Sequence, residues 1–225
     1  MSILSRLLGL FGRRTAPAAP STPVPPPAQT PLALSDTDLA LAAETGILEA
    51  YLLKVKGAGQ NLRQLEGMDE DGDALPASGV TVDVPHEQAV DIAHRLQASA
   101  PPGWLAFVSD RHFGIGGAPD QVSVLRASTI SDVLQVMGTN GWNYDISPDM
   151  VVARIQEWEK RHGLVLQGAG FDWFEASFTS QPPDMLAFAN EVYEFCPDVV
   201  DQGTESVEAL ADEMARTNTV YLWWD

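Results

Sequence analysis

The chain has few cysteines and few basic residues, and both shortages limit what it can be. A single cysteine, Cys196, among 225 residues excludes an intrachain disulfide, which fits a reducing cytoplasm. Thirteen basic residues against 31 acidic ones give a formal net charge of −18. Such a surface disfavours nucleic acid as a partner and favours a basic protein, although it also serves plain solubility.

Long apolar runs and cofactor motifs are missing as well. No run approaches the ~18 apolar residues that a membrane span needs. The glycines of GIGG (114–117) and GAG (168–170) fit no phosphate-binding pattern. Asp69, Asp71 and Asp73 alternate without the glycine and glutamate of a calcium loop, and the four histidines lack a zinc-ligand spacing. We therefore predict no cofactor and no metal.

Residues 1–34 differ from the rest in composition. The apolar residues of MSILSRLLGLFGRR recur at helical spacing, which predicts a short amphipathic helix over 1–14. Its arginines mostly follow the apolar residues, contrary to a secretion signal, and weak contact with an anionic inner-membrane surface stays open. Residues 15–34 contain seven prolines and predict a disordered linker. The expected location is the cytoplasm.

The globular body is predicted to begin near Ser35 and to be α+β, with helices packed on a mixed sheet. Its N-terminal lobe is expected over 35–127 and its C-terminal lobe over 128–225. Residues 66–79 are predicted as an acidic loop. The predicted helices cover 35–54, 85–99, 129–137, 147–162, 184–196 and 204–216, and the predicted strands cover 80–84, 104–110, 121–127, 164–170, 171–178 and 219–224.

Ten of the 18 aromatic residues lie in the last 55 positions, interleaved with acids. Strand alternation over FDWFEASF (171–178) predicts Phe174 on one face and Trp173 with Glu175 on the other. Alternation over the last strand predicts Trp223 on the face opposite Trp224. If both strands join one sheet, Trp173, Glu175 and Trp223 form an outward aromatic–acidic surface. The candidate binding residues are these three, Asp172, and the loop residues Asn143, Tyr144, Asp145, Asp198, Asp201 and Gln202.

Cys196 is predicted to be a buried structural thiol. It continues the helical spacing of Met185, Ala189 and Val192, so it shares their apolar stripe. It also lies near a helix C-terminus, where the dipole disfavours a thiolate nucleophile.

The second half of the chain resembles the bacterial family called domain of unknown function 4253. The resemblance rests on TNGWNYDIS (139–147), GAGFDWFE (168–175), EVYEFCPDVVDQG (191–203) and the closing LWWD (222–225). PHEQAVDIAHRLQ with GWLAF (85–107) is similar to the preceding region of such proteins. The resemblance implies a shared fold and no established reaction, so no catalytic residue is carried over.

Three functions are compatible with these patterns. The first is a non-catalytic acidic protein-binding module, and by analogy with small acidic bacterial immunity proteins its partner would be a basic toxin. The second is a hydrolase-like enzyme that uses Asp172, Glu175 or Asp198 for acid–base chemistry. The third is a scaffold tethered to the membrane by residues 1–14.

Overall fold

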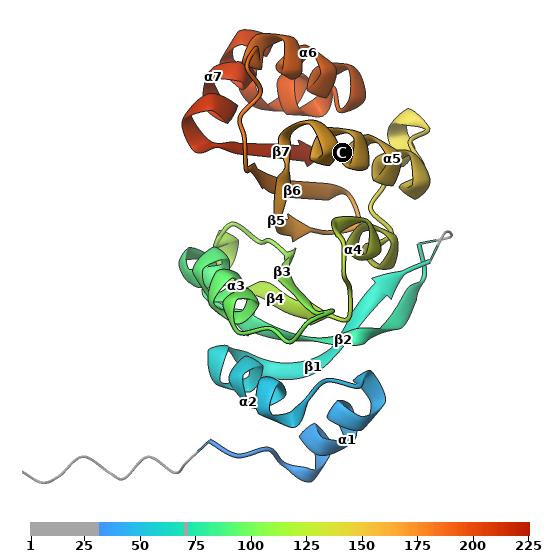
Figure 1. Cartoon of the computed structure of the whole chain (residues 1–225), viewed down its shortest axis with the longest axis vertical. Coiled ribbons are helices and arrows are strands. Elements are labelled where there is room, and N and C mark those ends of the chain that lie inside the picture. The colour runs from blue at the N-terminus through green and yellow to red at the C-terminus, as the bar shows by residue number, and fades with distance from the viewer. Residues whose placement is uncertain (1–31, 70–71) are drawn as a thin grey trace, which may run out of the picture. The chain divides into compact units, whose positions relative to one another are not determined.

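Seven strands form one mixed sheet in the order β1-β2-β4-β3-β5-β6-β7 (Figure 1). Neighbouring strands are antiparallel except β3 and β5, which are parallel, and this confirms the predicted α+β class. The computed structural model describes residues 32–69 and 72–225. The strands are β1 Gln60–Met68, β2 Ala74–Val84, β3 Leu105–Asp110, β4 Asp120–Leu125, β5 Leu164–Ala169, β6 Trp173–Phe178 and β7 Thr219–Trp223.

Helices follow or precede these strands at the sequence signals that predict them. Ser147 caps α5 with its side chain and Pro148 begins it, as expected. The α-helices are α1 Asp36–Thr45, α2 Glu49–Ala58, α3 Ala89–Ala98, α4 Ile130–Met137, α5 Pro148–His162, α6 Met185–Phe195 and α7 Val207–Thr217. Short 3-10 helices cover His86–Gln88, Ile115–Gly117 and Trp142–Tyr144, and a π-helix covers Val199–Thr204. None of the helices in these ranges is long and apolar enough to cross a membrane.

The two faces of the sheet are buried by different helices. One face carries Val80, Val82 and Val122 and packs against α1, α2 and α3. The opposite face carries Phe107 and Phe174 and packs against α4, α5, α6 and α7. The first face continues over β6 and β7, where it holds the predicted aromatic–acidic residues.

Two predictions about the N-terminal part of the body are wrong. The sequence predicts a single helix over 35–54, but α1 ends at Thr45, because the left-handed backbone of Gly46 (φ 74°) caps it, and α2 begins at Glu49. The expected acidic loop over 66–79 is the β1–β2 hairpin instead. Strand alternation does not predict β1, because its apolar residues Leu62, Leu65 and Met68 are spaced by three residues and not by two.

Some predictions lie outside the described residues. The helix over 1–14 and the part of the linker that precedes Leu32 both fall there. Any account of membrane contact through residues 1–14 is therefore still a prediction from sequence.

Candidate functional site

The two strands that carry the predicted surface are neighbours in the sheet. Trp173 of β6 lies directly opposite Trp223 of β7, and Glu175 lies opposite Tyr221. All four therefore share one face, as strand alternation predicts. Trp173 is buried and its ring stacks on Tyr221 with a centroid distance of 6.2 Å, while Trp223, Tyr221 and Glu175 are half-buried.

The GAG segment is the surface on which the Trp173 ring lies. A Cβ at Gly168 would overlap the six-membered ring of Trp173 and come within 2.8 Å of the Val108 carbonyl oxygen. A Cβ at Gly170 would overlap the indole nitrogen of the same side chain. These two glycines are needed for close packing, which explains the motif without a phosphate ligand.

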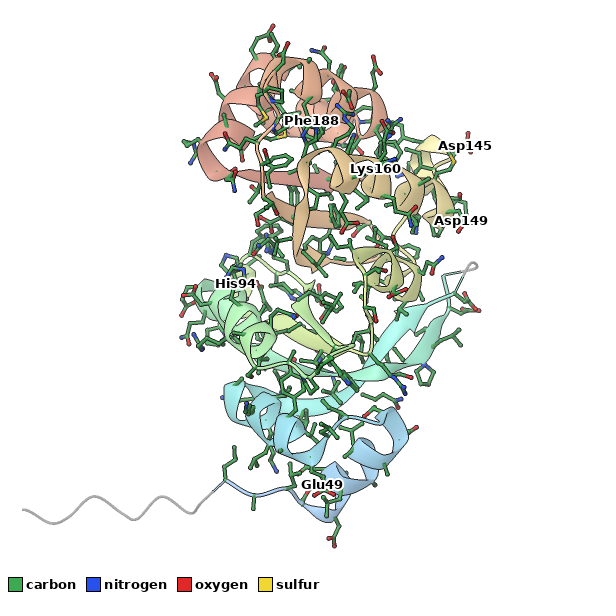
Figure 2. All side chains as sticks on the ribbon, viewed as in Figure 1. Glu49, His94, Asp145, Asp149, Lys160 and Phe188 are labelled. Carbon is green, nitrogen blue, oxygen red and sulfur yellow. The ribbon has the colours of Figure 1, made fainter. Side chains whose placement is uncertain are left out.

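Arg111 pairs with Glu175, the predicted acidic residue of this face. Sequence patterns do not predict this arginine. Its Nη2 lies 2.7 Å from Glu175 Oε2, at ion-pair distance but without hydrogen-bond alignment. Its Cζ lies 5.1 Å from the centre of the Trp173 ring, a cation–π contact. Arg111 follows β3, and only the pairing of β3 with β5 brings it here, so no local pattern reveals it. His94, labelled on α3 in Figure 2, contacts the same sheet: its Nε2 lies 2.6 Å from Gln167 Oε1 of β5.

A cavity of about 460 Å³, called here the aromatic–acidic cavity, opens beside this stack. Its walls combine four aromatic rings, two carboxylates and one guanidinium. The lining residues are Asp110, Arg111, Phe113, Asp172, Trp173, Tyr221 and Trp223.

Asp172 lies where three cavities meet. It lines the aromatic–acidic cavity and two others, of about 710 Å³ and 220 Å³. Among the described residues no other residue donates a hydrogen bond to its carboxylate and no lysine or arginine pairs with it. Partial desolvation raises its pKa, and the nearby charges of Asp110 and Asp225 raise it further. Asp172 is therefore a carboxylate without a cationic partner.

Asp198 is in the opposite situation. It is buried, its Oδ1 accepts hydrogen bonds from the Tyr144 hydroxyl (2.5 Å) and Gln202 Nε2 (2.9 Å), and its Oδ2 accepts one from the Asp225 backbone N–H (2.9 Å). Burial alone would raise the pKa of Asp198, but these three hydrogen bonds outweigh it and lower the pKa. The bond to Asp198 in turn raises the pKa of Tyr144 to about 12. Asn143 Nδ2 donates to the Asp225 carbonyl oxygen.

The structure thus divides the ten predicted site residues into two groups and two outliers. Asp172, Trp173 and Trp223 line the aromatic–acidic cavity, and Glu175 lies behind its wall, paired with Arg111. Asn143 and Asp198 bond to Asp225, while Tyr144 and Gln202 bond to Asp198, and these four residues are called here the Asp198 anchor. The outliers are Asp145, which is exposed (Figure 2), and Asp201, which accepts a hydrogen bond from the Tyr193 hydroxyl at 3.0 Å.

The buried cysteine behaves as predicted. Cys196 is fully buried, and burial raises the pKa of its thiol to about 12. Its sulfur donates to the Trp223 carbonyl oxygen and accepts from the Trp223 N–H, so the thiol fixes the end of β7. His162 is also buried; its Nε2 has no hydrogen-bond partner among the described residues, and its ring packs edge-on against Phe178 and Phe188.

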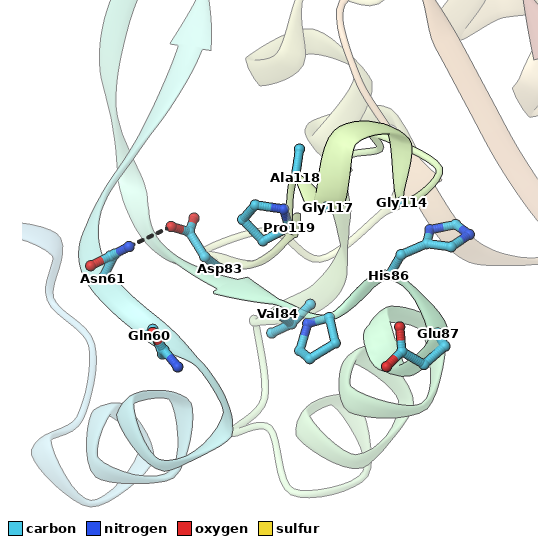
Figure 3. A pocket seen from close by; sticks show the side chains of 11 residues that line it. Gln60, Asn61, Asp83, Val84, His86, Glu87, Gly114, Gly117, Ala118 and Pro119 are labelled. Carbon is cyan, nitrogen blue, oxygen red and sulfur yellow. Dashed lines mark hydrogen bonds between the residues drawn. The ribbon is translucent and has the colours of Figure 1, made fainter.

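A second arrangement that sequence reasoning missed is the pair His86–Asp120. His86 Nδ1 lies 2.8 Å from Asp120 Oδ2, and the fully buried Asp120 also accepts a hydrogen bond from the His112 N–H. Figure 3 shows His86 beside the turn that carries Gly114 and Gly117, at a cavity of about 380 Å³. No serine, threonine or cysteine lines that cavity among the described residues. The pair holds the 111–117 turn against the end of β2. Because His86 and Asp120 are 34 positions apart, no local sequence pattern predicts their contact.

Comparison with known proteins identifies the C-terminal half. The family model described as "Domain of unknown function (DUF4253)" matches residues 121–225. Neither the curated proteins nor the solved structures gave a match. The match contains FCPD and LWWD, and the 85–107 segment lies outside it. Residues 121–225 therefore match the DUF4253 family model, as their resemblance to that family predicts.

Proposed function

We propose that the protein is a non-catalytic binding module that recognises a basic protein through the surface around Asp172. One observation carries the proposal: an unpaired carboxylate lies where three cavities meet, between aromatic walls. Aromatic side chains in pockets are the usual anchors of protein interfaces, and an unpaired carboxylate beside them selects a cation.

The charge of the body supports the same partner. Three of the 13 basic residues and none of the 31 acidic ones lie in 1–31, which leaves ten against 31, or −21, for residues 32–225. The negative electrostatic field of this body raises the association rate with a basic protein and repels nucleic acid. A basic toxin is one partner with this chemistry, in which case the module would act as an immunity-type inhibitor.

The arrangement of carboxylates favours binding over hydrolysis. The predicted hydrolase needs at least two of the carboxylates of Asp172, Glu175 and Asp198 in one cavity with perturbed pKa values. Asp198 is fully engaged in its anchor, and Glu175 is paired with Arg111. Of the three carboxylates predicted for a hydrolase, only Asp172 lines the aromatic–acidic cavity. The scaffold alternative depends on residues 1–14.

Photo-crosslinking in cells tests the proposal. A photoreactive phenylalanine analogue replaces Phe113, which is 55% exposed at the rim of the cavity, and a control carries it at Leu186 of α6, which is 46% exposed. We expect a basic protein to crosslink from position 113 and not from position 186. The purified partner should then bind the wild type more weakly as salt rises.

The Asp172→Asn variant completes the test. It keeps the shape of the side chain and removes the charge, so we expect affinity for that partner to fall about tenfold, or about 1.4 kcal/mol. Equal crosslinking from both positions, or affinity that is independent of salt and of Asp172, would contradict the proposed function.

A further inference from the structure

One wall of the aromatic–acidic cavity already contains a cation, the guanidinium of Arg111. Arg111 places its guanidinium over the Trp173 ring and within ion-pair distance of Glu175. Its side chain is only 13% exposed, so this guanidinium belongs to the wall and leaves the open volume free. Arg111 Cζ also lies 6.0 Å from the centre of the Phe113 ring, so two aromatic rings and one carboxylate already have this cation as a partner.

Other walls of the cavity offer aromatic rings and carboxylates without a lysine or arginine of the described residues. The rings are those of Tyr221 and Trp223, which are half-buried, whereas Phe113, exposed at the rim, already contacts Arg111. Asp110 and Asp172 supply two carboxylates. Asp110 accepts a hydrogen bond from Gln121 Nε2 at 3.1 Å and lies 3.8 Å from His112 Nε2, and neither acid pairs with a lysine or arginine of the described residues. Aromatic faces and two carboxylates therefore surround a cavity of about 460 Å³.

We propose that this cavity is a subsite for an arginine side chain of the basic partner. The guanidinium stacks on Trp223 or Tyr221 and donates hydrogen bonds to Asp172 and Asp110. The proposal rests on the proposed function and names the residue type that the site recognises.

Arginine fits this cavity better than lysine for two reasons. A guanidinium is planar, so it can stack on an aromatic ring and donate to two carboxylates at once. An ammonium is a strongly hydrated point charge that gives up more solvation energy to enter an aromatic-walled cavity. The negative charge of the cavity alone would attract either cation. A preference for arginine over lysine therefore distinguishes a specific subsite from nonspecific attraction by an acidic surface.

Three short peptides that differ at one position test the subsite with the full-length protein. Each has the same neutral sequence around a central arginine, lysine or citrulline. Binding is followed by NMR through the indole N–H signals of Trp173 and Trp223. We expect the arginine peptide to bind about fivefold more tightly than the lysine peptide, and the uncharged citrulline peptide not to bind.

Two variants test whether the preference for the arginine peptide over the lysine peptide arises in this cavity. Asp172→Asn should abolish the difference between arginine and lysine, and Asp212→Asn on the exposed side of α7 should leave it unchanged. Thermal unfolding of both variants checks that each is folded. Equal binding of the arginine and lysine peptides, or no binding of either, overturns the arginine subsite. The proposed function fails on a separate result, the salt- and Asp172-independence of the crosslinked partner.

Discussion

Asp172 and Asp198 are two aspartates of the same half of the chain with opposite surroundings. Three donors surround Asp198, whose pKa is lowered, whereas acids and aromatic rings surround Asp172, whose pKa is raised. A carboxylate with all its hydrogen bonds made within the chain stabilises the fold and has little left for a partner. A carboxylate left without a partner weakens the fold slightly and is free to bind one. The contrast separates a residue that stabilises the fold from a candidate binding residue, and residue type alone does not make that distinction.

The largest effect should come from removing the anchor. Asp198→Ala deletes a buried acceptor of three hydrogen bonds, so we expect the free energy of unfolding to fall by about 3 kcal/mol. Urea denaturation followed by circular dichroism measures it. Asp201→Ala, which removes one exposed acceptor from the neighbouring turn, is the control. Similar small losses in both variants would show that the anchor is not structural.

A methyl group under Trp173 should have the next largest effect. Gly168→Ala places a Cβ against the indole and the Val108 carbonyl oxygen, so we expect a loss of about 2 kcal/mol in the free energy of unfolding. Val165→Ala on the exposed side of the same strand should change little, since Val165 is 50% exposed. Unchanged stability and unchanged Trp173 signals in Gly168→Ala would contradict the close packing described above.

Loss of the wall cation should cost less. Arg111→Gln leaves Glu175 without its ion pair and uncovers Trp173, and we expect about 1 kcal/mol of destabilisation. A double-mutant cycle with Glu175→Gln isolates the contribution of the pair. Additive losses in the cycle would mean that the two charges do not interact.

The pH dependence of stability should have opposite signs at the two aspartates. The lowered pKa of Asp198 means that its contribution is present above the unfolded pKa, near 3.8, and is lost as pH falls through the lower folded value. The raised pKa of Asp172 means that its small penalty is absent below the unfolded value and complete above the folded one. Asp172→Asn should therefore stabilise slightly at neutral pH and not at strongly acid pH. Unfolding curves at the two pH values check the sign, and a loss of stability at neutral pH would contradict it.

Sequence periodicity predicts the parts of the site that depend on local geometry. Alternation assigns Trp173 and Glu175 to one face, and helical spacing assigns Cys196 to the core. The contacts that complete the candidate site are not local. Arg111 reaches Glu175 only because β3 adjoins β5, and Tyr144 reaches Asp198 across 54 residues. The sequence therefore does not reveal that Asp198 accepts three hydrogen bonds within the chain whereas Asp172 accepts none from another described residue.

The packing of Trp173 on Gly168 and Gly170 also constrains which substitutions proteins similar to this one can accept. A Cβ at either glycine would overlap the Trp173 side chain, so a larger residue there requires the ring to move or to be replaced. We expect relatives that keep a tryptophan at this position to keep both glycines, and relatives that acquire a smaller side chain there to accept alanine or serine beneath it. An aligned set of relatives would then show the three positions changing together, and would mark which members of the family retain the aromatic wall.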